Sequence, residues 1–344
     1  MKEAIVSAGP SVKIVDSPIP KPNADQVVTK VIYSGSNPKD WKVPEWMGEK
    51  GVANQGDDVS GIVHEVGENV VEFKKGDRVM AFHEMMAPGG SYAEYALSWK
   101  HTTFHLPKNT SFSEGAAIPL AALTAAVGLY ARLGLPEPWL PASKDSSKTP
   151  LVIYGASSSV GSYALQLAIK SNIHPLITIA GKAASHVEQF LDKSKGDVLI
   201  DYRKGDEHVV SSIKSALNGA PLLHGFDAVS EKGSVENFTK VIDPKGKVTF
   251  VLPGKDYPGF ADTVETSTTR VGDVHGDLKD FGYVWSRYLS KGLEEGWFKA
   301  QPQEVVPGGL GGVEQALKNL KDGKASAVKY VFKIEDTPGA GSGQ

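Results

Sequence analysis

The sequence predicts an α/β protein with a β-rich first domain and a second domain built on a doubly wound parallel sheet. Its 344 residues exceed what one hydrophobic core usually supports, so two domains are expected. Short runs rich in valine, isoleucine and aromatic residues, separated by turn residues, occupy the first hundred positions. From Leu151 onward, apolar runs of strand length alternate with helix-like stretches, which is the pattern of βαβ units and a parallel sheet.

The first domain is expected to contain several strands followed by a helical region. The β-branched and aromatic runs that predict strands are Gln26–Tyr33, Gly61–Val66 and Asp77–Phe82. From Ser113 to Leu133 the residues are rich in alanine and leucine and predict helix, with Ser113 and Glu114 as N-terminal capping residues. A polar stretch containing prolines, Pro136–Pro150, predicts a surface connection, and Pro338–Gln344 predicts a frayed tail.

The second domain is expected to alternate strands and helices. Its predicted strands are Leu151–Tyr154, Leu176–Ala180, Val198–Asp201, Phe226–Val229 and Val248–Leu252. Helices are predicted over Val160–Lys170 and Ala183–Lys193, between the first three of these strands. Parallel strands joined through helices form right-handed crossovers, so we expect one sheet with helices on both faces.

Composition narrows the classes of function. The net charge of −3 and a pI near 6.3 give no large basic field, so nucleic acid and anionic membranes are poor candidates as partners. Cysteine is absent, which excludes disulfides, thiolate nucleophiles and thiolate-ligated zinc. The longest weakly polar run, Ala116–Ala131, is too short for a membrane span and is interrupted by Pro119 and Gly128. A cytoplasmic location is the expectation.

A glycine-containing loop after the first strand of the second domain predicts a dinucleotide site. Leu151–Tyr154 leads into Gly155-Ala156-Ser157-Ser158-Ser159-Val160-Gly161 and then into a helix. Gly155 permits a tight turn, and Gly161 lets the helix pack close to the strand. The small serines let backbone N–H groups at the helix start reach a pyrophosphate, although serine replaces the usual middle glycine. An ordinary βα turn is the alternative interpretation.

The next strand indicates which dinucleotide is preferred. NAD sites place an acidic residue about 20 residues further on, to bind the ribose 2′-hydroxyl. Here the strand ends Ala180-Gly181-Lys182, and no acidic residue occurs between Gly161 and Glu188. Lys182 stands where a cation can pair with a 2′-phosphate, so NADPH is the expected cofactor. The alternative is that Lys182 is a solvated surface lysine.

With these motifs in place, the chain resembles the medium-chain dehydrogenase/reductase superfamily along nearly its whole length. The further matching segments are Gly56–Val63, Val66-Gly67, Gly76–Val79, Gly89–Tyr95, Leu123-Thr124-Ala125, Gly308–Leu310 and Gly323-Lys324. Asn37-Pro38-Lys39-Asp40-Trp41-Lys42 is similar to the Asn-Pro-x-Asp segment of the zinc-less quinone reductase and enoyl reductase branch. Within that branch, the chain looks most like the fungal trans-acting enoyl reductases.

The resemblance implies a fold and a set of cofactor contacts. It implies a GroES-like substrate domain over residues 1–125 and 290–344, with a Rossmann NADPH-binding domain over residues 126–289 between them. It places Tyr202 near the adenosine phosphate and Lys329 near the cofactor. Thr124, in a matching segment, and Leu252, at the end of a predicted strand, are also expected to bind the cofactor.

Departures from the zinc-dependent relatives predict that no metal is bound. Those relatives carry Gly-His-Glu where this chain has Gly56-Asp57-Asp58, and they use cysteines that this chain lacks. The nearby pair His64-Glu65 lies inside a predicted strand without a matching third ligand, so a structural role is expected for it. No serine lies in a Gly-x-Ser-x-Gly elbow, so a hydrolase triad is unsupported.

The expected reaction is transfer of hydride from NADPH to a conjugated carbonyl or a quinone. Without zinc to polarise a carbonyl, direct alcohol dehydrogenation is disfavoured. The protein must then supply positioning and a donor for the developing enolate. That donor is expected to be Lys42, Asn37 or water, while Asp40 orients a neighbour.

Two other functions remain open. The chain is alternatively a reductase of simple or aromatic aldehydes, or an NADPH-binding redox sensor or scaffold protein with little turnover. Steady-state assays separate these possibilities. A monomer and a homodimer are both compatible with the sequence.

Overall fold

A computed structural model describes residues 1–140 and 149–341 of the chain. Parts of the expected connection 136–150 and of the expected tail 338–344 therefore lie outside the described residues. The chain forms two compact units: unit 1 comprises Met1–Leu120 and Gly272–Gln344, and unit 2 comprises Ala121–Val271. Each unit is described separately below.

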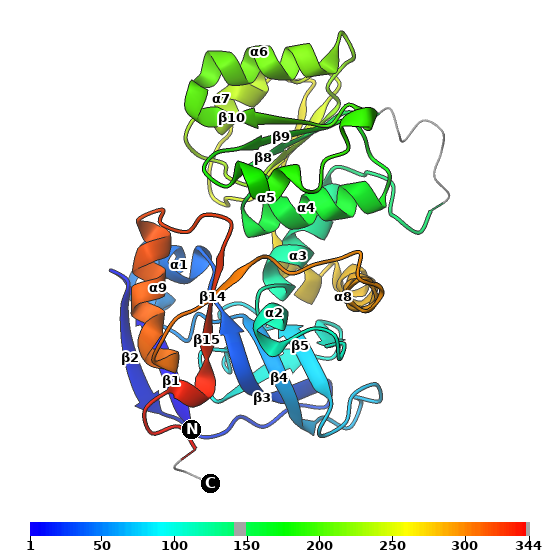
Figure 1. The fold of residues 1–344 in the computed structure, drawn as a ribbon. Helices are drawn as coiled ribbons and strands as arrows, with labels where there is room; N and C mark the ends of the chain where they lie inside the picture. The colour runs from blue at the N-terminus through cyan, green and yellow to red at the C-terminus, as the bar shows by residue number, and fades with distance from the viewer. Residues whose placement is uncertain (141–148, 342–344) are drawn as a thin grey trace. The chain divides into compact units, whose positions relative to one another are not determined.

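Unit 1 is built mainly from β-strands (Figure 1). Its strands are β1 (Lys2–Ser7), β2 (Ser11–Asp16), β3 (Gln26–Gly35), β4 (Asp58–Val66), β5 (Arg78–Phe82), β6 (Tyr95–Trp99), β7 (Thr103–His105), β14 (Gln303–Val305) and β15 (Lys329–Lys333). Its helices are α1 (Lys39–Met47), α2 (Phe112–Gly115), α8 (Lys279–Glu295) and α9 (Val313–Lys321), with short 3₁₀ turns η1 (Gly48–Gly51), η6 (Val271–His275), η7 (Gly309–Gly312) and η8 (Ile334–Asp336) near them. The three predicted strands are confirmed as β3, β4 and β5.

A seven-stranded sheet joins the two ends of the chain in unit 1. The order β14-β15-β3-β4-β5-β7 is completed by β6, which pairs with β3. Strand β15 runs antiparallel to β3, with Val331 opposite Gly35. This pairing confirms the expectation that the C-terminal segment returns to complete the first domain. Val31 of β3 and Val59 of β4 belong to one buried hydrophobic cluster, and consecutive residues at the start of β4 are buried.

The predicted helical region 113–133 is three segments in the structure. They are α2, α3 (Pro119–Ala126), which begins in unit 1 and continues into unit 2, and the π-helix η2 (Val127–Arg132). The predicted cap at Ser113 is wrong. Ser111 caps α2: its side chain accepts a hydrogen bond from the backbone N–H of Glu114 at 3.2 Å, and Glu114 accepts one from the N–H of Ser111 at 2.7 Å. The capping box places the helix start two residues earlier than predicted.

Unit 2 contains a six-stranded sheet in which every described pair of neighbours is parallel. Its strands are β8 (Leu151–Tyr154), β9 (Leu176–Ala180), β10 (Val198–Asp201), β11 (His224–Asp227), β12 (Lys247–Phe250) and β13 (Glu265–Thr268). The order β10-β9-β8-β11-β12-β13 is that of a doubly wound Rossmann sheet. The first three strands have the predicted bounds, whereas β11 and β12 end two residues before the predicted ends. The fold class predicted from the sequence is thus confirmed.

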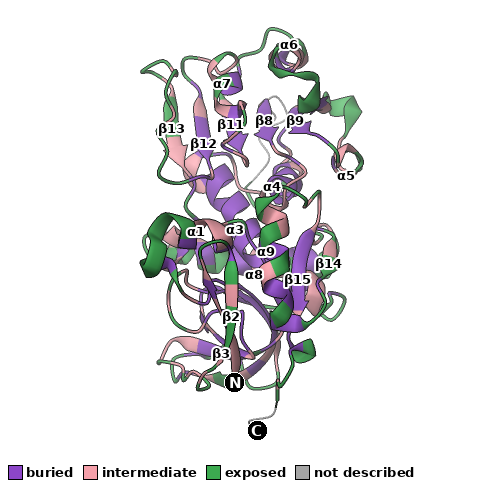
Figure 2. Ribbon diagram, turned by 90° about the vertical axis from the view of Figure 1, so that its left-hand side faces the viewer, coloured by how far each residue is buried: buried purple, intermediate pink, exposed green. Residues whose placement is uncertain are grey.

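Helices cover both faces of the unit 2 sheet, as Figure 1 shows. The helices that connect successive strands along the chain are α4 (Ser159–Lys170), α5 (Ala184–Glu188), α6 (Asp206–Leu217) and α7 (Ser234–Thr239). The 3₁₀ turns η4 (Lys193–Lys195) and η5 (Tyr202–Lys204) lie in the same connections. Helix α4 matches its prediction, whereas α5 covers only half of the predicted 183–193 stretch. The central strands are buried, and the outer side of α6 is exposed (Figure 2). All residues of β8 and β9 are buried, which explains their continuous apolar runs.

The division of the chain differs from the expected boundaries at 125/126 and 289/290. Unit 2 ends at Val271, so all of α8 belongs to unit 1. The physical reason is that α8 is bonded to the segments around β7. Its Arg287 donates to the carbonyl oxygens of Lys100 at 2.9 Å and His101 at 3.2 Å, and its Ser290 hydroxyl donates to the carbonyl of His105.

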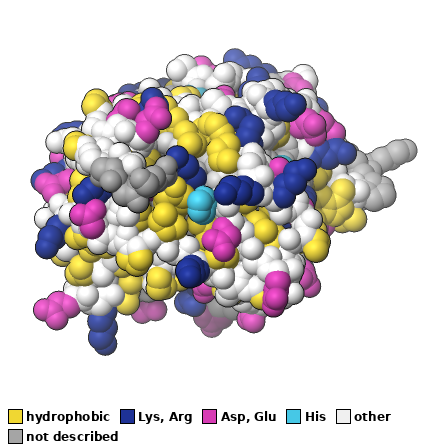
Figure 3. All heavy atoms as spheres, turned by 90° about the horizontal axis from the view of Figure 1, so that it is seen from below, with side chains coloured by type: hydrophobic (Ala, Val, Ile, Leu, Met, Phe, Trp, Pro, Cys, Tyr) yellow, Lys and Arg dark blue, Asp and Glu magenta, His cyan; other side chains and the backbone are white. Residues whose placement is uncertain are grey.

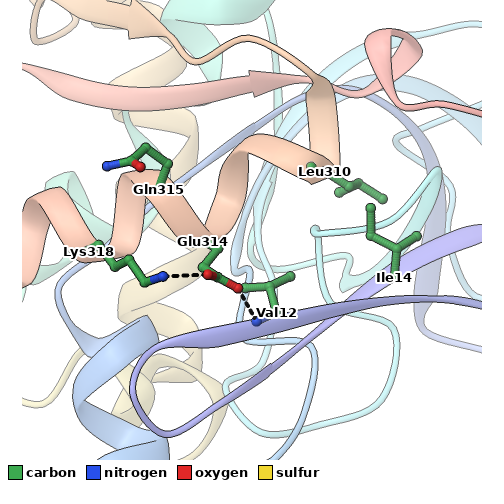
Figure 4. Close-up of a pocket in the computed structure, with 7 residues that line it drawn as sticks. Val12, Ile14, Leu310, Glu314, Gln315 and Lys318 are labelled. Carbon is green, nitrogen blue, oxygen red and sulfur yellow. Dashed lines mark hydrogen bonds and ion pairs between the residues drawn. The ribbon is translucent and has the colours of Figure 1, made fainter.

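Helix α9 packs beside the β1–β2 hairpin of unit 1. A shallow pocket of about 360 Å³ lies between them, lined by Val12, Ile14, Leu310 and residues of α9 (Figure 4). The carboxylate of Glu314 accepts hydrogen bonds from the backbone N–H of Val12 and from the ammonium of Lys318 (Figure 4). These bonds tie the exposed strand β2 to the C-terminal part of unit 1.

The surface carries charges of both signs. In the face shown in Figure 3, lysine and arginine side chains alternate with aspartate and glutamate, without a broad area of one sign. This pattern agrees with the small net charge of the sequence. Among the described residues, no helix is long and apolar enough to cross a membrane.

A buried carboxylate organises the turn after β11. Asp227 is not exposed to solvent, and its oxygens accept hydrogen bonds from the backbone N–H groups of Val229 (2.9 Å) and Ser230 (2.7 Å) and from the hydroxyl of Ser234 (2.6 Å). Burial raises the pKa of Asp227 to about 6, although these three donors oppose the shift. Ionised Asp227 therefore lowers the stability of the folded state.

We predict that Gly61→Ala strongly destabilises unit 1. Gly61 lies in β4 opposite Val31 of β3, and a Cβ atom there would lie 2.0 Å from the carbonyl oxygen of Lys30. Because that oxygen belongs to a paired strand and cannot move away, we expect a loss of at least about 2 kcal/mol in the free energy of unfolding. Denaturant titration followed by tryptophan fluorescence measures it. Gly311→Ala is the matched control, because no atom lies within 4 Å of its added Cβ. Equal stability of the two variants would contradict the argument.

We predict that Asp227→Asn removes part of the pH dependence of stability. The folded-state pKa of about 6 lies above the value of 3.8 expected for the unfolded chain. The wild type should therefore lose stability, relative to the variant, as the pH rises from about 4 to 7. From a shift of this size the difference should reach roughly 2–3 kcal/mol. Asparagine can still accept from the two N–H groups and donate to Ser234. Thermal unfolding of both proteins at several pH values tests this prediction. If stability depends on pH in the same way in the wild type and the variant, burial does not penalise the ionised form of Asp227.

Candidate functional site

In unit 2, the predicted cofactor residues gather at the carboxyl edge of the parallel sheet. Gly155 follows β8, Gly181 follows β9, Tyr202 follows β10 and Leu252 follows β12 closely. Neighbouring parallel strands end at one edge, so these residues lie along it. Strands β9 and β11 flank β8 on opposite sides, and such a reversal of strand order is where doubly wound sheets bind ligands.

The turn after β8 requires both of its glycines. Gly155 has a φ of +76°, and a Cβ atom on it would lie 2.4 Å from the side chain of Val229. A Cβ on Gly161 would lie 2.3 Å from the carbonyl oxygen of Gly155 and 2.8 Å from the Cα of Ala156. The first glycine makes the turn, and the second lets α4 approach the end of the strand. This is the close backbone geometry that a bound pyrophosphate needs.

The serines between these glycines divide into two roles. Ser158 is the N-cap of α4, and its hydroxyl accepts a hydrogen bond from the N–H of Gly161 at 3.0 Å. Ser159 and Val160 are the first residues of the helix, and Ser157 precedes the cap. The N–H of Gly161 is already bonded to the Ser158 hydroxyl. An anion at this helix start would therefore be bound mainly by the other backbone N–H groups of the first turn.

The ends of β9 and β10 meet through Gly181 and Tyr202. A Cβ on Gly181 would lie 2.6–2.9 Å from the ring of Tyr202, so the ring packs directly on the glycine backbone. Tyr202 itself is about half exposed, and the neighbouring Lys182 is exposed. Arg203 pairs with Asp201 through its Nε at 2.8 Å and its Nη2 at 2.5 Å, and it lowers the pKa of Asp201 to about 2. The negative charge nearest to Tyr202 in sequence is therefore already paired with a cation.

Two other predicted cofactor residues of unit 2 are buried. Thr124 lies in α3 and is 6% exposed. Leu252 is buried just after β12, and its carbonyl oxygen accepts a hydrogen bond from the hydroxyl of Tyr257. Contact of Thr124 and Leu252 with a cofactor stays a prediction.

In unit 1, a buried polar network brings together three of the predicted residues. Lys329 of β15 donates to the side-chain oxygen of Asn37 at 2.7 Å and to Asp58 at 2.8 Å. Asn37 in turn donates from its side-chain amide to Asp58 at 2.8 Å. The second oxygen of Asp58 accepts from the backbone N–H of Leu120, at the start of α3. The side chains of Lys329 and Asp58 are at most 4% exposed, so this is a buried ion pair that is also hydrogen-bonded to Asn37.

The network continues through Asp40 to Lys39 and Asp57. Asp40 accepts from the N–H of Asn37 at 2.7 Å and from the hydroxyl of Tyr92 at 2.5 Å. The ammonium of Lys39 pairs with Asp40 at 3.2 Å and with Asp57, and it donates to the carbonyl oxygen of Gln55 at 2.6 Å. On its other side, Asp57 lies 2.8 Å from Nδ1 of His83. Asn37, Asp40 and Lys329 therefore belong to one connected set.

Burial and neighbouring charges shift the acidities within this network. Burial raises the pKa of Asp40 to about 6, even though Lys39 opposes the shift. Although burial acts in the same direction on Asp57, Lys39 and His83 together hold its pKa below the usual value. Burial alone would lower the pKa of Lys39, but Asp57 and Asp40 raise it. Burial and the adjacent Asp40 raise the pKa of Tyr92 well above its usual value.

Both ring nitrogens of His83 face oxygen atoms. Its Nδ1 lies 2.8 Å from a carboxylate oxygen of Asp57, and its Nε2 lies 3.2 Å from the carbonyl oxygen of Pro88. These two contacts fix the orientation of the ring beside Asp57.

Lys42 lies close to two tryptophan rings. It is on α1, one turn after Lys39, and its Nζ lies 5.4 Å from the ring centroid of Trp41 and 6.0 Å from that of Trp46. This is the geometry of a cation over aromatic faces. Lys42 is within the first helix and not on the loop before it.

The sequence alone does not indicate five further members of this buried network, which are Lys39, Asp57, Asp58, His83 and Tyr92. From the sequence, Asp57 and Asp58 are interpreted as part of a segment that matches the superfamily and as the loss of zinc ligands. A signal was present, because two adjacent carboxylates open an apolar strand, Asp58–Val66, and buried carboxylates require partners. The identity of those partners depends on long-range contacts, since Lys329 is 271 residues away from Asp58.

The side chains of Asp57 and His64 contact other side chains of unit 1. Within the described residues, no group of three histidine, aspartate or glutamate side chains is arranged to hold a metal ion. His64 packs instead edge-to-face against Tyr95, with 4.9 Å between ring centroids. The position next to Gly56 is taken by Asp57, whose oxygens face Lys39 and His83.

Comparison with known proteins places this geometry in a family. Residues 23–108 match the alcohol dehydrogenase GroES-like domain. The chain is 60% identical over 309 residues to trans-enoyl reductase fsr4 of Gibberella fujikuroi, covering 90% of this chain and 91% of that protein. It is 30% identical to trans-enoyl reductase ACTTS2 of Alternaria alternata, covering 96% and 98% of the two chains. The crystal structure of CurK enoyl reductase shares the fold, with a TM-score of 0.77 at 18% identity over 96% and 98% of the two chains.

These matches span both units, and they agree with a dinucleotide fold in unit 2 and a GroES-like β-domain in unit 1. They identify an oxidoreductase that uses a nicotinamide cofactor and acts on a small molecule. The chain belongs to the trans-enoyl reductase family, in the enoyl reductase-like branch of the medium-chain dehydrogenase/reductase superfamily.

Proposed function

We propose that this protein is an NADPH-dependent, zinc-independent reductase of conjugated carbonyl compounds, with an enoyl group as its preferred acceptor. The observation that carries the proposal is the carboxyl edge of the unit 2 sheet, where a turn with two obligatory glycines follows β8 and an exposed lysine follows the neighbouring strand β9 closely. The trans-enoyl reductase relatives support the enoyl acceptor.

The residues at this edge fit an NADP dinucleotide. The turn from Gly155 to Gly161 leaves the backbone donors of α4 open to a pyrophosphate. The half-exposed ring of Tyr202 lies against Gly181 and offers a flat surface for the adenosine end, and Lys182 supplies a cation for the 2′-phosphate. Asp201 would repel that phosphate, but its charge is held by Arg203. From the resemblance to the superfamily, we also propose that Lys329 lies near the cofactor.

Hydride addition to a conjugated carbonyl does not require a metal ion to polarise the carbonyl group. When bound, the nicotinamide supplies a hydride to the β-carbon of the acceptor, and negative charge develops on the carbonyl oxygen. A cationic hydrogen-bond donor stabilises that oxygen, and we propose Lys42 for this role. Asn37 is the weaker candidate, because its side-chain amide already donates to Asp58 and accepts from Lys329. Asp40 orients Asn37 by accepting its backbone N–H.

Steady-state assays with enoyl thioesters, enones, quinones and aldehydes, each with NADPH and a strong chelator, test the proposal. Turnover of the conjugated acceptors in the presence of chelator is the expected result. A preference for simple aldehydes would identify an aldehyde reductase. Tight NADPH binding without turnover of any acceptor would identify a sensor or scaffold protein. Loss of activity on chelation, together with stoichiometric zinc in the purified protein, would overturn zinc independence.

We predict that Lys182→Ala reduces the preference for NADPH over NADH. A charged contact to the 2′-phosphate contributes on the order of 1.5–3 kcal/mol, so the wild type should bind NADPH at least about tenfold more tightly than NADH. Dissociation constants from fluorescence quenching measure the preference in both proteins. Lys170→Ala, at the far end of α4, is the matched control for loss of one surface charge. Unchanged discrimination in Lys182→Ala would remove this residue from the cofactor site.

We predict that Lys42→Ala lowers kcat by roughly ten- to a thousandfold without changing the NADPH dissociation constant. The reason is that a donor to the developing enolate acts mainly in the transition state. Steady-state and binding measurements with an enoyl thioester separate the two effects. A rise in KM alone would mean that Lys42 binds substrate uniformly. Turnover equal to that of the wild type would leave water or Asn37 as the donor.

A further inference from the structure

A hollow of about 560 Å³ lies in unit 1, beside the segment that leads into α2. Its lining comes from three parts of the chain: Tyr33 of β3, Arg78 at the start of β5, and the segment 108–114. All of these residues belong to unit 1, so unit 1 alone forms the hollow. The charged side chains of the lining are two cations, Arg78 and Lys108, and one carboxylate, that of Glu114.

The guanidinium of Arg78 is held in place by neutral groups. Its Cζ lies 4.1 Å from the ring centroid of Phe112, and its Nη2 donates to the carbonyl oxygen of Thr110 at 2.6 Å. Within residues 1–140 and 149–341, Arg78 forms no ion pair with a carboxylate, and its Nε–H has no acceptor. These contacts fix the plane of the guanidinium and leave its charge unbalanced. Because Arg78 is partly buried, an anion beside it would stabilise this charge.

Lys108 brings a second cation to the same hollow. It is exposed, and its ammonium forms neither a hydrogen bond nor an ion pair with any residue that the structure describes. The loop that carries it is anchored on both sides. The N–H of Thr110 donates to the carbonyl oxygen of Pro107 at 3.1 Å, and the side-chain amide of Asn109 donates to the carbonyl oxygen of Leu293 at 3.1 Å. The backbone of Lys108 thus stays beside the hollow while its ammonium can turn toward a ligand.

The carboxylate in the lining is already engaged. Glu114 accepts hydrogen bonds from the backbone N–H and from the hydroxyl of Ser111, both at 2.7 Å. These bonds form the capping box of α2, and Glu114 makes no ion pair with either cation of the hollow. The hydroxyl groups of Tyr33 and Ser113 also line the hollow, and that of Tyr33 has no hydrogen-bond partner among the described residues. Two unpaired cations with hydroxyl donors are the composition of an oxyanion site.

We propose that this hollow binds the phosphate group of a small phosphomonoester. A guanidinium presents its N–H groups in a plane that matches phosphate oxygens, and an ammonium adds a second positive charge. A phosphate group has enough oxygens for both cations and the hydroxyl donors, whereas a carboxylate has fewer. The hollow is much larger than a phosphate group, so an organic part fits beside the ring of Phe112. This site uses none of the residues assigned to the cofactor or to the acceptor, so it does not rest on the proposed function.

The test is the binding of inorganic phosphate and of phenyl phosphate to the whole chain, measured by isothermal titration calorimetry at constant ionic strength. Each titration is made with and without saturating NADPH, because NADPH would occupy the phosphate-binding turn proposed for unit 2. We expect phenyl phosphate to bind in both conditions and more tightly than inorganic phosphate. Sodium chloride at the same ionic strength is the control for general screening of charge.

Variants assign the binding to this hollow. Lys108→Ala should weaken the binding of phenyl phosphate by about two- to fivefold, because an exposed ammonium contributes modestly. Arg78→Lys keeps the positive charge but loses the planar set of donors, so we expect a loss of at least about fivefold. Lys50→Ala removes an exposed ammonium outside the hollow and is the matched control. Lys108 makes no internal bond, so Lys108→Ala tests the site even if Arg78→Lys proves unstable in thermal unfolding.

Each result has a defined meaning. Affinity unchanged in both Lys108→Ala and Arg78→Lys would overturn the proposal. Complete loss of phosphate binding with saturating NADPH would assign the anion to unit 2 and would also overturn it, as would an equal effect of sodium chloride. Equal affinities for the two phosphates, both weakened in the two variants, would support the site and identify free phosphate as a sufficient ligand.

Discussion

Two adjacent carboxylates at the start of β4 govern the arrangement of unit 1. Asp57 and Asp58 are buried, and unpaired buried charges are incompatible with a stable fold. Asp58 takes its partners from β15, from the loop before α1 and from the start of α3, which fixes three distant segments around one side chain. Asp57 takes Lys39 and His83. The contacts of Asp57 with Lys39 and of Asp58 with Asn37 thus hold helix α1 against the start of β4.

The sheet of unit 2 was the most predictable part of the fold, for a local reason. Every residue of β8 and β9 is buried, so each of these strands appears in the sequence as an uninterrupted apolar run with the observed bounds. Strand β10 lies at the sheet edge and is only partly buried, but its short apolar run also gives the observed bounds. The region after Ser111 was less predictable. Alanine and leucine favour helix throughout, but the break before Pro119 and the π-turn of η2 depend on packing, such as that of Gly128 against Phe226. The place of α8 depends on bonds to β7 that no local pattern reveals.

The site was predictable where it depends on the backbone and much less so where it depends on side chains. Gly155 and Gly161 were assigned their turn and packing roles from spacing alone, and the contacts that a Cβ would make support both assignments. In unit 1, the resemblance indicated Asn37, Asp40 and Lys329 without showing that they share one network. Lys39 has no distinctive sequence signal. Its place in the network becomes visible only in the fold, where it forms an ion pair with Asp57, 18 residues further on in the sequence.

The discontinuity of unit 1 has a consequence for biosynthesis. Unit 2 is one continuous segment, Ala121–Val271, whereas unit 1 combines the two ends of the chain. Strand β15 pairs with β3, and Lys329 forms an ion pair with Asp58, but both follow the whole of unit 2 in the sequence. During translation, the N-terminal part of unit 1 therefore carries an unpaired carboxylate and an open sheet edge until β15 has been synthesised, whereas unit 2 already has its whole sequence by then. A chain that stops before β15 would lack part of unit 1 and none of unit 2.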